Sequence, residues 1–224
     1  MPVSIEEDER KLWEEAKRRR AEIEKNGMIV ADEALTRYLN GVLATLMAEP
    51  LSEQAPVPGV HVLRSPQRNA YAAPDGGILV STGMLAAIQN EAQLAALLGH
   101  ELGHFIARHG LMRQRFEKLS GSSVERMQLS RDNEAYCDRF ALEVMRRAGY
   151  DPREIVLLNL QLTEPDDAGW AGGWTVLRSH PFTAERIRAL QEPIGHARED
   201  DVRTERERYN EAIAPLLPVA AEVE

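Results

Sequence analysis

The chain has 224 residues, of which 43% are hydrophobic, so it is long enough to bury a core and short enough for one domain with appendages. Its 27 basic and 36 acidic residues leave a net charge of −9, which argues against non-specific nucleic-acid binding. The single cysteine, Cys137, excludes an internal disulfide. The sequence has no apolar run of the roughly 18 residues that a membrane-spanning helix needs.

The first part of the chain is predicted to contain two helices and three short strands. A charged helix runs from Ser4 to Gly27 and is too polar to be a signal peptide. Asp32 caps a second helix, which ends before Pro50. Short strands are expected at residues 60–63, 69–72 and 78–80.

The second part is predicted to be helical. Asn90 caps a long, mostly buried helix that Gly110 is expected to end. Ser130 is expected to cap the next helix. Further helices are expected to begin near Asp151, Thr183 and Arg198. Taken together, these elements predict a mostly helical α+β domain with a small sheet packed beside the helix that Asn90 caps.

The most informative motif lies inside that helix, at His100-Glu101-Leu102-Gly103-His104. Side chains four residues apart share one face of a helix, so His100 and His104 can bind one metal ion together. Glu101 lies a fraction of a turn away, within reach of a water on that metal. The H-E-x-x-H spacing is typical of zinc peptidases.

The alternative is a surface helix whose two histidines merely face solvent. Two glycines of the same helix, Gly99 and Gly103, count against it. Glycine inside a helix is unfavourable by about 1 kcal/mol. Close packing against a neighbouring element is therefore the expected reason for them.

A catalytic zinc ion takes three protein ligands and keeps one position open. The astacin-like pattern would need glycine at 107 and histidine at 110, where this chain has Ala107 and Gly110. A glutamate from a downstream helix is expected instead, and the candidates are Glu117, Glu125, Glu134 and Glu143. Glu134 is placed best, because Asp138 follows one turn later and can hold a histidine by its other nitrogen. The alternative is that both are ordinary solvated charges.

Three ordered motifs carry a family resemblance: His100-Glu101-x-x-His104, Ser130-Arg131-x-x-Glu134-x-x-x-Asp138 and His180-Pro181-x-x-x-x-Arg186-Ile187. The segments Asn69-Ala70-Tyr71-Ala72 and Gly76-Gly77-x-Leu79 match too. Together they resemble the CAAX prenyl endopeptidase family of zinc metallopeptidases. That family also holds HtpX-like and Oma-like stress proteases and soluble or periplasmic relatives. The resemblance covers roughly residues 5–192.

The resemblance implies a zincin-like metallopeptidase domain over residues 28–192, flanked by a charged helix at 1–27 packed on it and a helical extension at 193–224. It implies one Zn²⁺ per chain, with the ligands His100, His104 and Glu134. It further implies Glu101 as general base, Asp138 as support for a ligand, and His180 and Arg186 at the active site, where His180 could stabilise the oxyanion. The residues Asn69, Ala70, Tyr71 and Ala72 would form the edge on which an extended peptide lies by β-addition.

We therefore predict a zinc endopeptidase that cleaves unfolded or extended protein segments. Glu101 takes the proton of the zinc-activated water as it attacks, and then hands that proton to the leaving amine. Two alternatives stay open: a latent enzyme in which His180 closes the fourth zinc position, and a non-proteolytic zinc-binding chaperone or interaction module. The presence of Glu101 argues against the second.

The chain departs from the family in lacking the transmembrane segments of the prenyl proteases and HtpX-like members. The soluble branch is therefore closer, and prenylated substrates are not expected. The cell envelope is expected if a leader was removed, and the cytoplasm if Met1 is the native start.

Three further histidines, two tryptophans and the cysteine are not expected to take part in the chemistry. Cys137 is predicted to be a small buried residue rather than a thiolate that competes for zinc. Three histidines have no partner pattern and are interpreted as structural or exposed: His61, His109 and His196. Trp170 and Trp174 are interpreted as core anchors rather than parts of a substrate-gating loop.

Overall fold

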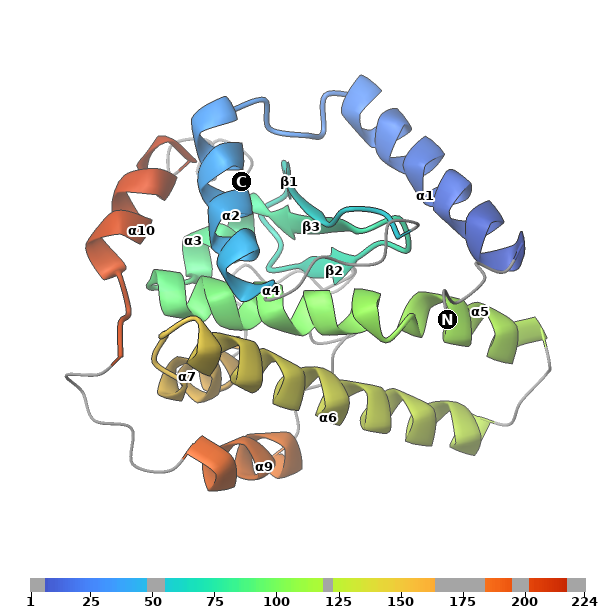
Figure 1. Cartoon of the computed structure of the whole chain (residues 1–224). Helices are drawn as coiled ribbons and strands as arrows, with labels where there is room; N and C mark the ends of the chain where they lie inside the picture. Colours follow the sequence, from blue (N-terminus) through green and yellow to red (C-terminus); the bar gives the residue numbers. More distant parts are fainter. Residues whose placement is uncertain (1–6, 48–54, 119–122, 164–183, 195–201, 217–224) are drawn as a thin grey trace.

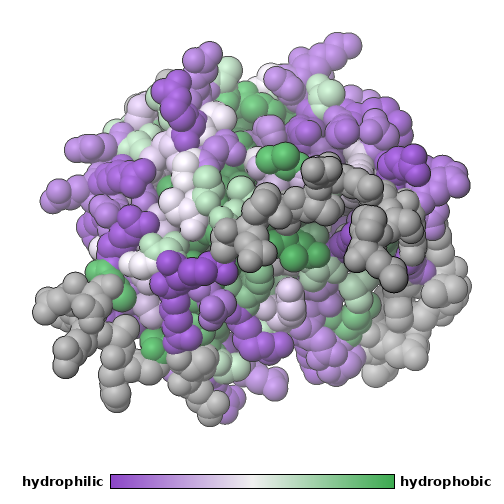
Figure 2. Space-filling view, viewed as in Figure 1, coloured by the Kyte–Doolittle hydropathy of each residue, from purple (hydrophilic) through white to green (hydrophobic). Residues whose placement is uncertain are grey.

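The computed structural model describes residues 7–47, 55–118, 123–163, 184–194 and 202–216. Over these residues the fold is mostly helical with one three-stranded sheet, so the predicted α+β class is confirmed (Figure 1). No helix in the described part of the chain is both long and apolar enough to cross a membrane. Hydrophilic side chains cover much of the face in Figure 2, with smaller apolar patches between them.

The sheet is built from the three predicted strands, β1 (Gly59–Leu63), β2 (Ala70–Ala72) and β3 (Gly77–Ser81). The central strand β3 pairs with β1 in parallel and with β2 in antiparallel orientation. All five residues of β3 are buried, as expected for a strand covered on both faces. Within the described residues β2 has a strand neighbour on one side only, so it forms an edge of the sheet.

Helix α4 (Glu91–Ile106) is the centre of the molecule and carries the H-E-x-x-H motif. The predicted cap is confirmed, because the side chain of Asn90 accepts a hydrogen bond from the backbone N–H of Gln93 at 2.9 Å. The buried Glu91 carboxylate accepts hydrogen bonds from the hydroxyls of Tyr38 (2.8 Å) and Tyr150 (2.7 Å). These contacts fix the start of the helix to α2 (Glu33–Leu46) and to the segment between α6 (Ser123–Arg147) and α7 (Arg153–Thr163).

The other helices pack around α4 and the sheet. They are α1 (Glu7–Lys25), α2 (Glu33–Leu46), α3 (Thr82–Ala87), α5 (His109–Lys118), α6 (Ser123–Arg147), α7 (Arg153–Thr163), α9 (Ala184–Ile194) and α10 (Arg206–Ile213), which runs into the 3₁₀-helix η2 (Ala214–Leu216). In Figure 1 the sheet lies on one side of α4 and α6 on the other. Helix α6 runs antiparallel to α4 along most of its length and contacts it more than any other element does.

Three predicted helix boundaries are wrong. Helix α4 ends at Ile106, before the predicted Gly110, because Arg108 adopts a left-handed backbone (φ 55°) and α5 then begins at His109. Ser130 does not cap a helix but lies inside α6, whose start at Ser123 precedes it by two turns. The helix predicted from Arg198 is not helical at residues 202–205, and α10 begins only at Arg206; residues 198–201 lie outside the described part of the chain.

Helix α1 is joined to the sheet and to the end of α4 by two ion pairs. The guanidinium of Arg20 lies 2.5 Å from the fully buried carboxylate of Asp75, in the turn before β3. Arg108 pairs with the buried Glu9 at 3.1 Å. The division of the chain at residues 27 and 192 stays a prediction.

Candidate metal centre

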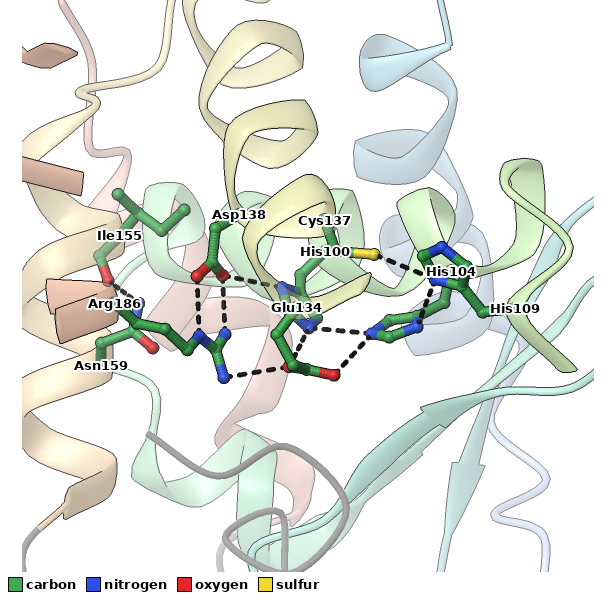
Figure 3. Close-up of polar contacts among 9 residues, drawn as sticks. All are labelled: His100, His104, His109, Glu134, Cys137, Asp138, Ile155, Asn159 and Arg186. Carbon is green, nitrogen blue, oxygen red and sulfur yellow. Dashed lines mark hydrogen bonds and ion pairs between the residues drawn. The ribbon is translucent and has the colours of Figure 1, made fainter. Parts of the chain in front are cut away.

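Three side chains from two helices converge beside the C-terminal half of α4 (Figure 3). The Nε2 atoms of His100 and His104 lie 3.2 Å apart. Glu134, which α6 supplies, places Oε2 3.3 Å from Nε2 of His100 and Oε1 3.3 Å from Nε2 of His104. Two imidazoles and one carboxylate therefore face one another across a small triangle, and Glu143, another predicted candidate, is exposed instead.

The two glycines of α4 allow α6 to approach this closely. A Cβ atom on Gly99 would lie 3.1 Å from the Cα of Ala141, and one on Gly103 would lie 3.3 Å from the Cα of Cys137. Both contacts are with the backbone of α6, so a side chain at either position would push the helix away. The prediction that these glycines mark close packing is confirmed, and the neighbour is the helix that carries Glu134.

Asp138 connects the triangle to helix α9. Its carboxylate lies 3.0 Å from Nδ1 of His100 and accepts two hydrogen bonds from Arg186, at 2.8 and 2.7 Å. The same guanidinium lies 3.0 Å from Glu134. Burial raises the pKa of Asp138, but hydrogen bonds with His100 and Arg186 outweigh it and leave the pKa below its usual value.

The electrostatics of the triangle favour a cation. Burial lowers the pKa of His100, but its hydrogen bonds with Asp138 and Glu134 outweigh that effect and raise the pKa to about 10. The carboxyl groups of Glu101, Glu134 and Asp138 outnumber the single guanidinium of Arg186. The carboxylates that stabilise a proton on the His100 ring would also stabilise a metal cation beside it.

The spacing of the donor atoms fits a tetrahedral ion. Ligands at 2.0–2.1 Å from a tetrahedral zinc ion lie about 3.3 Å from one another. The two nitrogens lie 3.2 Å apart, and each has one of the two Glu134 oxygens at 3.3 Å, Oε2 beside His100 and Oε1 beside His104. The residues present therefore fit a zinc ion in both chemistry and spacing.

Glu101 lies beside the triangle and is buried, with 1% of its surface exposed. Together with His100, Asp138 and Arg186 it lines a small cavity. The rest of the lining is largely apolar and comes from α4 and α7. A carboxylate at the wall of an apolar cavity next to a cation site is suitably placed for proton transfer.

Several predicted residues lie away from this centre or outside the described part of the chain. His180, His196, Trp170 and Trp174 lie outside the described residues. The four predicted substrate residues, Asn69, Ala70, Tyr71 and Ala72, lie in or next to the edge strand β2, which packs against α4. His61 is half-buried on β1.

The sequence interpretation missed His109. Its Nδ1 lies 3.0 Å from Nδ1 of His104 and 3.6 Å from the sulfur of Cys137 (Figure 3). Cys137 is fully buried, as predicted. A continuous helix places residues five apart about 140° from each other, so the spacing gave no sign of this contact. Only the break in the helix at Arg108 brings the two rings together.

An H-E-x-x-H helix whose two histidines lie beside a glutamate from a second helix is an arrangement typical of metallopeptidases. Comparison with known families agrees: the profile of peptidase family M48 matches residues 33–124 and 119–194. The chain belongs to this family. The predicted resemblance is confirmed, and the family places the chain among metalloendopeptidases, which are hydrolases that depend on a metal.

Known proteins of this family are similar to the chain over more than half its length. The mitochondrial metalloendopeptidase OMA1 of Schizosaccharomyces pombe is 26% identical over 62% of this chain and 47% of its own length. The protein of the same name from Arabidopsis thaliana is 29% identical over 58% of this chain and 30% of its own. The beta-barrel assembly-enhancing protease of Yersinia pestis is 24% identical over 56% of this chain and 32% of its own. The chain thus matches less than half the length of each of these relatives.

Proposed function

We propose that the chain is a zinc-dependent endopeptidase with a zincin-like domain that hydrolyses peptide bonds in unfolded or extended protein segments. The observation that carries this proposal is the triangle of donor atoms from His100, His104 and Glu134. The two nitrogens lie 3.2 Å apart and each has an oxygen of Glu134 at 3.3 Å, which suits a tetrahedral ion. Two histidines and one glutamate are a ligand set that zinc takes in peptidases. One zinc ion per chain would be bound by all three of these side chains.

A zinc ion bound there would supply Lewis-acid activation of a water molecule and of the peptide carbonyl. Glu101 would act as the general base that accepts the proton of the attacking water. It would then pass this proton to the leaving amine, as one carboxylate can do in both directions. Its place at the wall of the cavity beside His100 supports this role.

Asp138 and Arg186 would prepare the ligands for this task. A hydrogen bond from Nδ1–H of His100 to Asp138 would leave Nε2 of the ring available to hold the ion. Arg186 orients Asp138 by two hydrogen bonds and offsets part of the negative charge of Glu134. His180 remains the proposed oxyanion donor, or the fourth ligand of a latent enzyme.

The substrate would bind as an added strand along β2. This strand is an edge of the sheet within the described residues and packs against the helix that carries the metal ligands. An open strand edge binds peptide main chain without regard to most side chains, as unfolded substrates require. Residues Asn69, Ala70, Tyr71 and Ala72 would make these contacts.

The test is hydrolysis of unfolded casein by the zinc-loaded protein, with Glu101→Gln and a chelator as controls. We expect cleavage by the wild type, none with the chelator, and none by Glu101→Gln, which should still carry one zinc ion. Turnover at the wild-type rate in Glu101→Gln would refute the role of this residue. A wild type that carries zinc without cleaving casein would favour latency or a non-proteolytic zinc-binding module, which His180→Ala would then separate.

A further inference from the structure

The two histidines of the motif have different environments at the nitrogen that faces away from the triangle. Nδ1 of His100 is held by Asp138 at 3.0 Å. Nδ1 of His104 lies 3.0 Å from another ring nitrogen, Nδ1 of His109. The rings of His104 and His109 meet edge to face, with an interplanar angle of 76°. The second contact has no role in the function proposed above.

The chain adopts an unusual backbone to make this contact. Arg108 has φ 55°, a left-handed conformation that non-glycine residues seldom adopt. This residue separates α4 from α5 and turns His109 back towards the motif. The buried Glu9 of α1 pairs with Arg108 at 3.1 Å and so supports the break. The proximity of the two rings is thus built by three segments of the chain and is not a by-product of helical spacing.

Two ring nitrogens at this distance share one proton. An imidazole that binds a metal through Nε2 keeps its proton on Nδ1 and needs an acceptor there. His109 can be that acceptor if it is neutral with its own proton on Nε2.

We propose that His109 is a positioning residue that accepts the Nδ1–H hydrogen bond of His104 and holds its Nε2 towards the metal. It would do for His104 what Asp138 does for His100. This inference rests on the proposed function, because it assigns His104 as a zinc ligand. A neutral acceptor adds no charge to the site, whereas a second aspartate would add one.

The sulfur of Cys137 permits another interpretation, in which His104, His109 and Cys137 bind a second, soft metal ion. His104 could serve both ions only by losing the protons of both nitrogens. Burial also raises the pKa of Cys137 well above its usual value, which disfavours the thiolate that a metal requires. The hydrogen bond needs neither change, so we favour it.

The experiment compares His109→Asn with His109→Leu. The amide oxygen of asparagine hangs from Cγ, as Nδ1 of histidine does, and can accept the same hydrogen bond. Leucine has a methyl group at that place and cannot accept it. Zinc affinity is measured by competition with a chromophoric chelator, and thermal unfolding of the metal-free variants reports any general damage to the fold.

We expect His109→Leu to bind zinc about 10–100-fold more weakly than the wild type. His109→Asn should stay within about threefold, because it keeps the acceptor. In the zinc-loaded wild type, nitrogen-15 NMR of the side chains should show the proton of His104 on Nδ1 and a bare Nδ1 on His109. The NMR result does not depend on a variant that folds.

Each contrary result has a distinct meaning. A wild type that binds no zinc removes the proposed function and this inference together. Zinc binding by His109→Leu that equals the wild type overturns the inference alone, as does an equal loss in both variants, which would indicate packing. Two zinc ions per wild-type chain, one of them lost in Cys137→Ala, would also overturn it in favour of the second metal site.

Discussion

Replacing Gly99 by alanine tests whether the close packing of α4 and α6 sets the geometry of the proposed metal site. The added methyl would lie 3.0 Å from a methyl of Val144 and 3.1 Å from the Cα of Ala141. The first contact can relax by a side-chain rotation, but the second is with backbone, so α6 must move by a few tenths of an ångström. Helix α6 also carries Glu134, so this shift enlarges the triangle of donor atoms.

Two opposing terms decide the change in stability. Alanine is favoured over glycine inside a helix by about 1 kcal/mol. Overpacking a core contact costs about 1–3 kcal/mol. The free energy of unfolding of Gly99→Ala should therefore fall by about 0–2 kcal/mol. Zinc binding should weaken too, because ligand distances have to stay within about 0.2 Å of their ideal values.

Gly41 supplies a matched control. It lies inside helix α2, and a Cβ atom there would meet nothing within 4 Å. Gly41→Ala should raise the free energy of unfolding by about 0.5–1 kcal/mol and leave zinc binding unchanged. The assay is urea unfolding of both variants without metal, followed by zinc titration. Equal stabilisation by the two substitutions, with unchanged zinc affinity in both, would refute the argument.

Two further substitutions test the ligand set and the docking of the first helix. Glu134→Ala should lower the zinc content measured by elemental analysis. Glu143→Ala, which changes an exposed residue of the same helix, should leave the zinc content unchanged. Full zinc occupancy in Glu134→Ala would show that another residue is the third ligand. Arg20→Met leaves the carboxylate of Asp75 buried without its ion-pair partner and should lower the free energy of unfolding by about 1–3 kcal/mol. The control Arg19→Met breaks only an exposed ion pair and should change the free energy of unfolding by at most about 0.5 kcal/mol. Equal urea midpoints for these two variants would show that the pair does not hold α1 on the domain.

The sequence by itself determined the local features of this protein. The helix of the motif, its cap at Asn90 and the three short strands follow from periodicity and capping, which act over a few residues. The spacing of His100 and His104 places both on one face of any helix. Glycines at 99 and 103 signalled a close neighbour, because they are unfavourable in a helix that has none.

Tertiary structure decided which groups meet across the fold. Glu134 lies thirty residues beyond His104, and no local rule says that two antiparallel helices bring their side chains together. The start of α6 at Ser123, well before the expected cap at Ser130, shows that a residue with a strong capping preference can also lie inside a longer helix. The clearest case is His109, because the left-handed turn at Arg108 places it against His104, and contacts with a distant helix support that turn. Sequence periodicity assumes an unbroken helix, so a contact created by a break can be seen only in three dimensions.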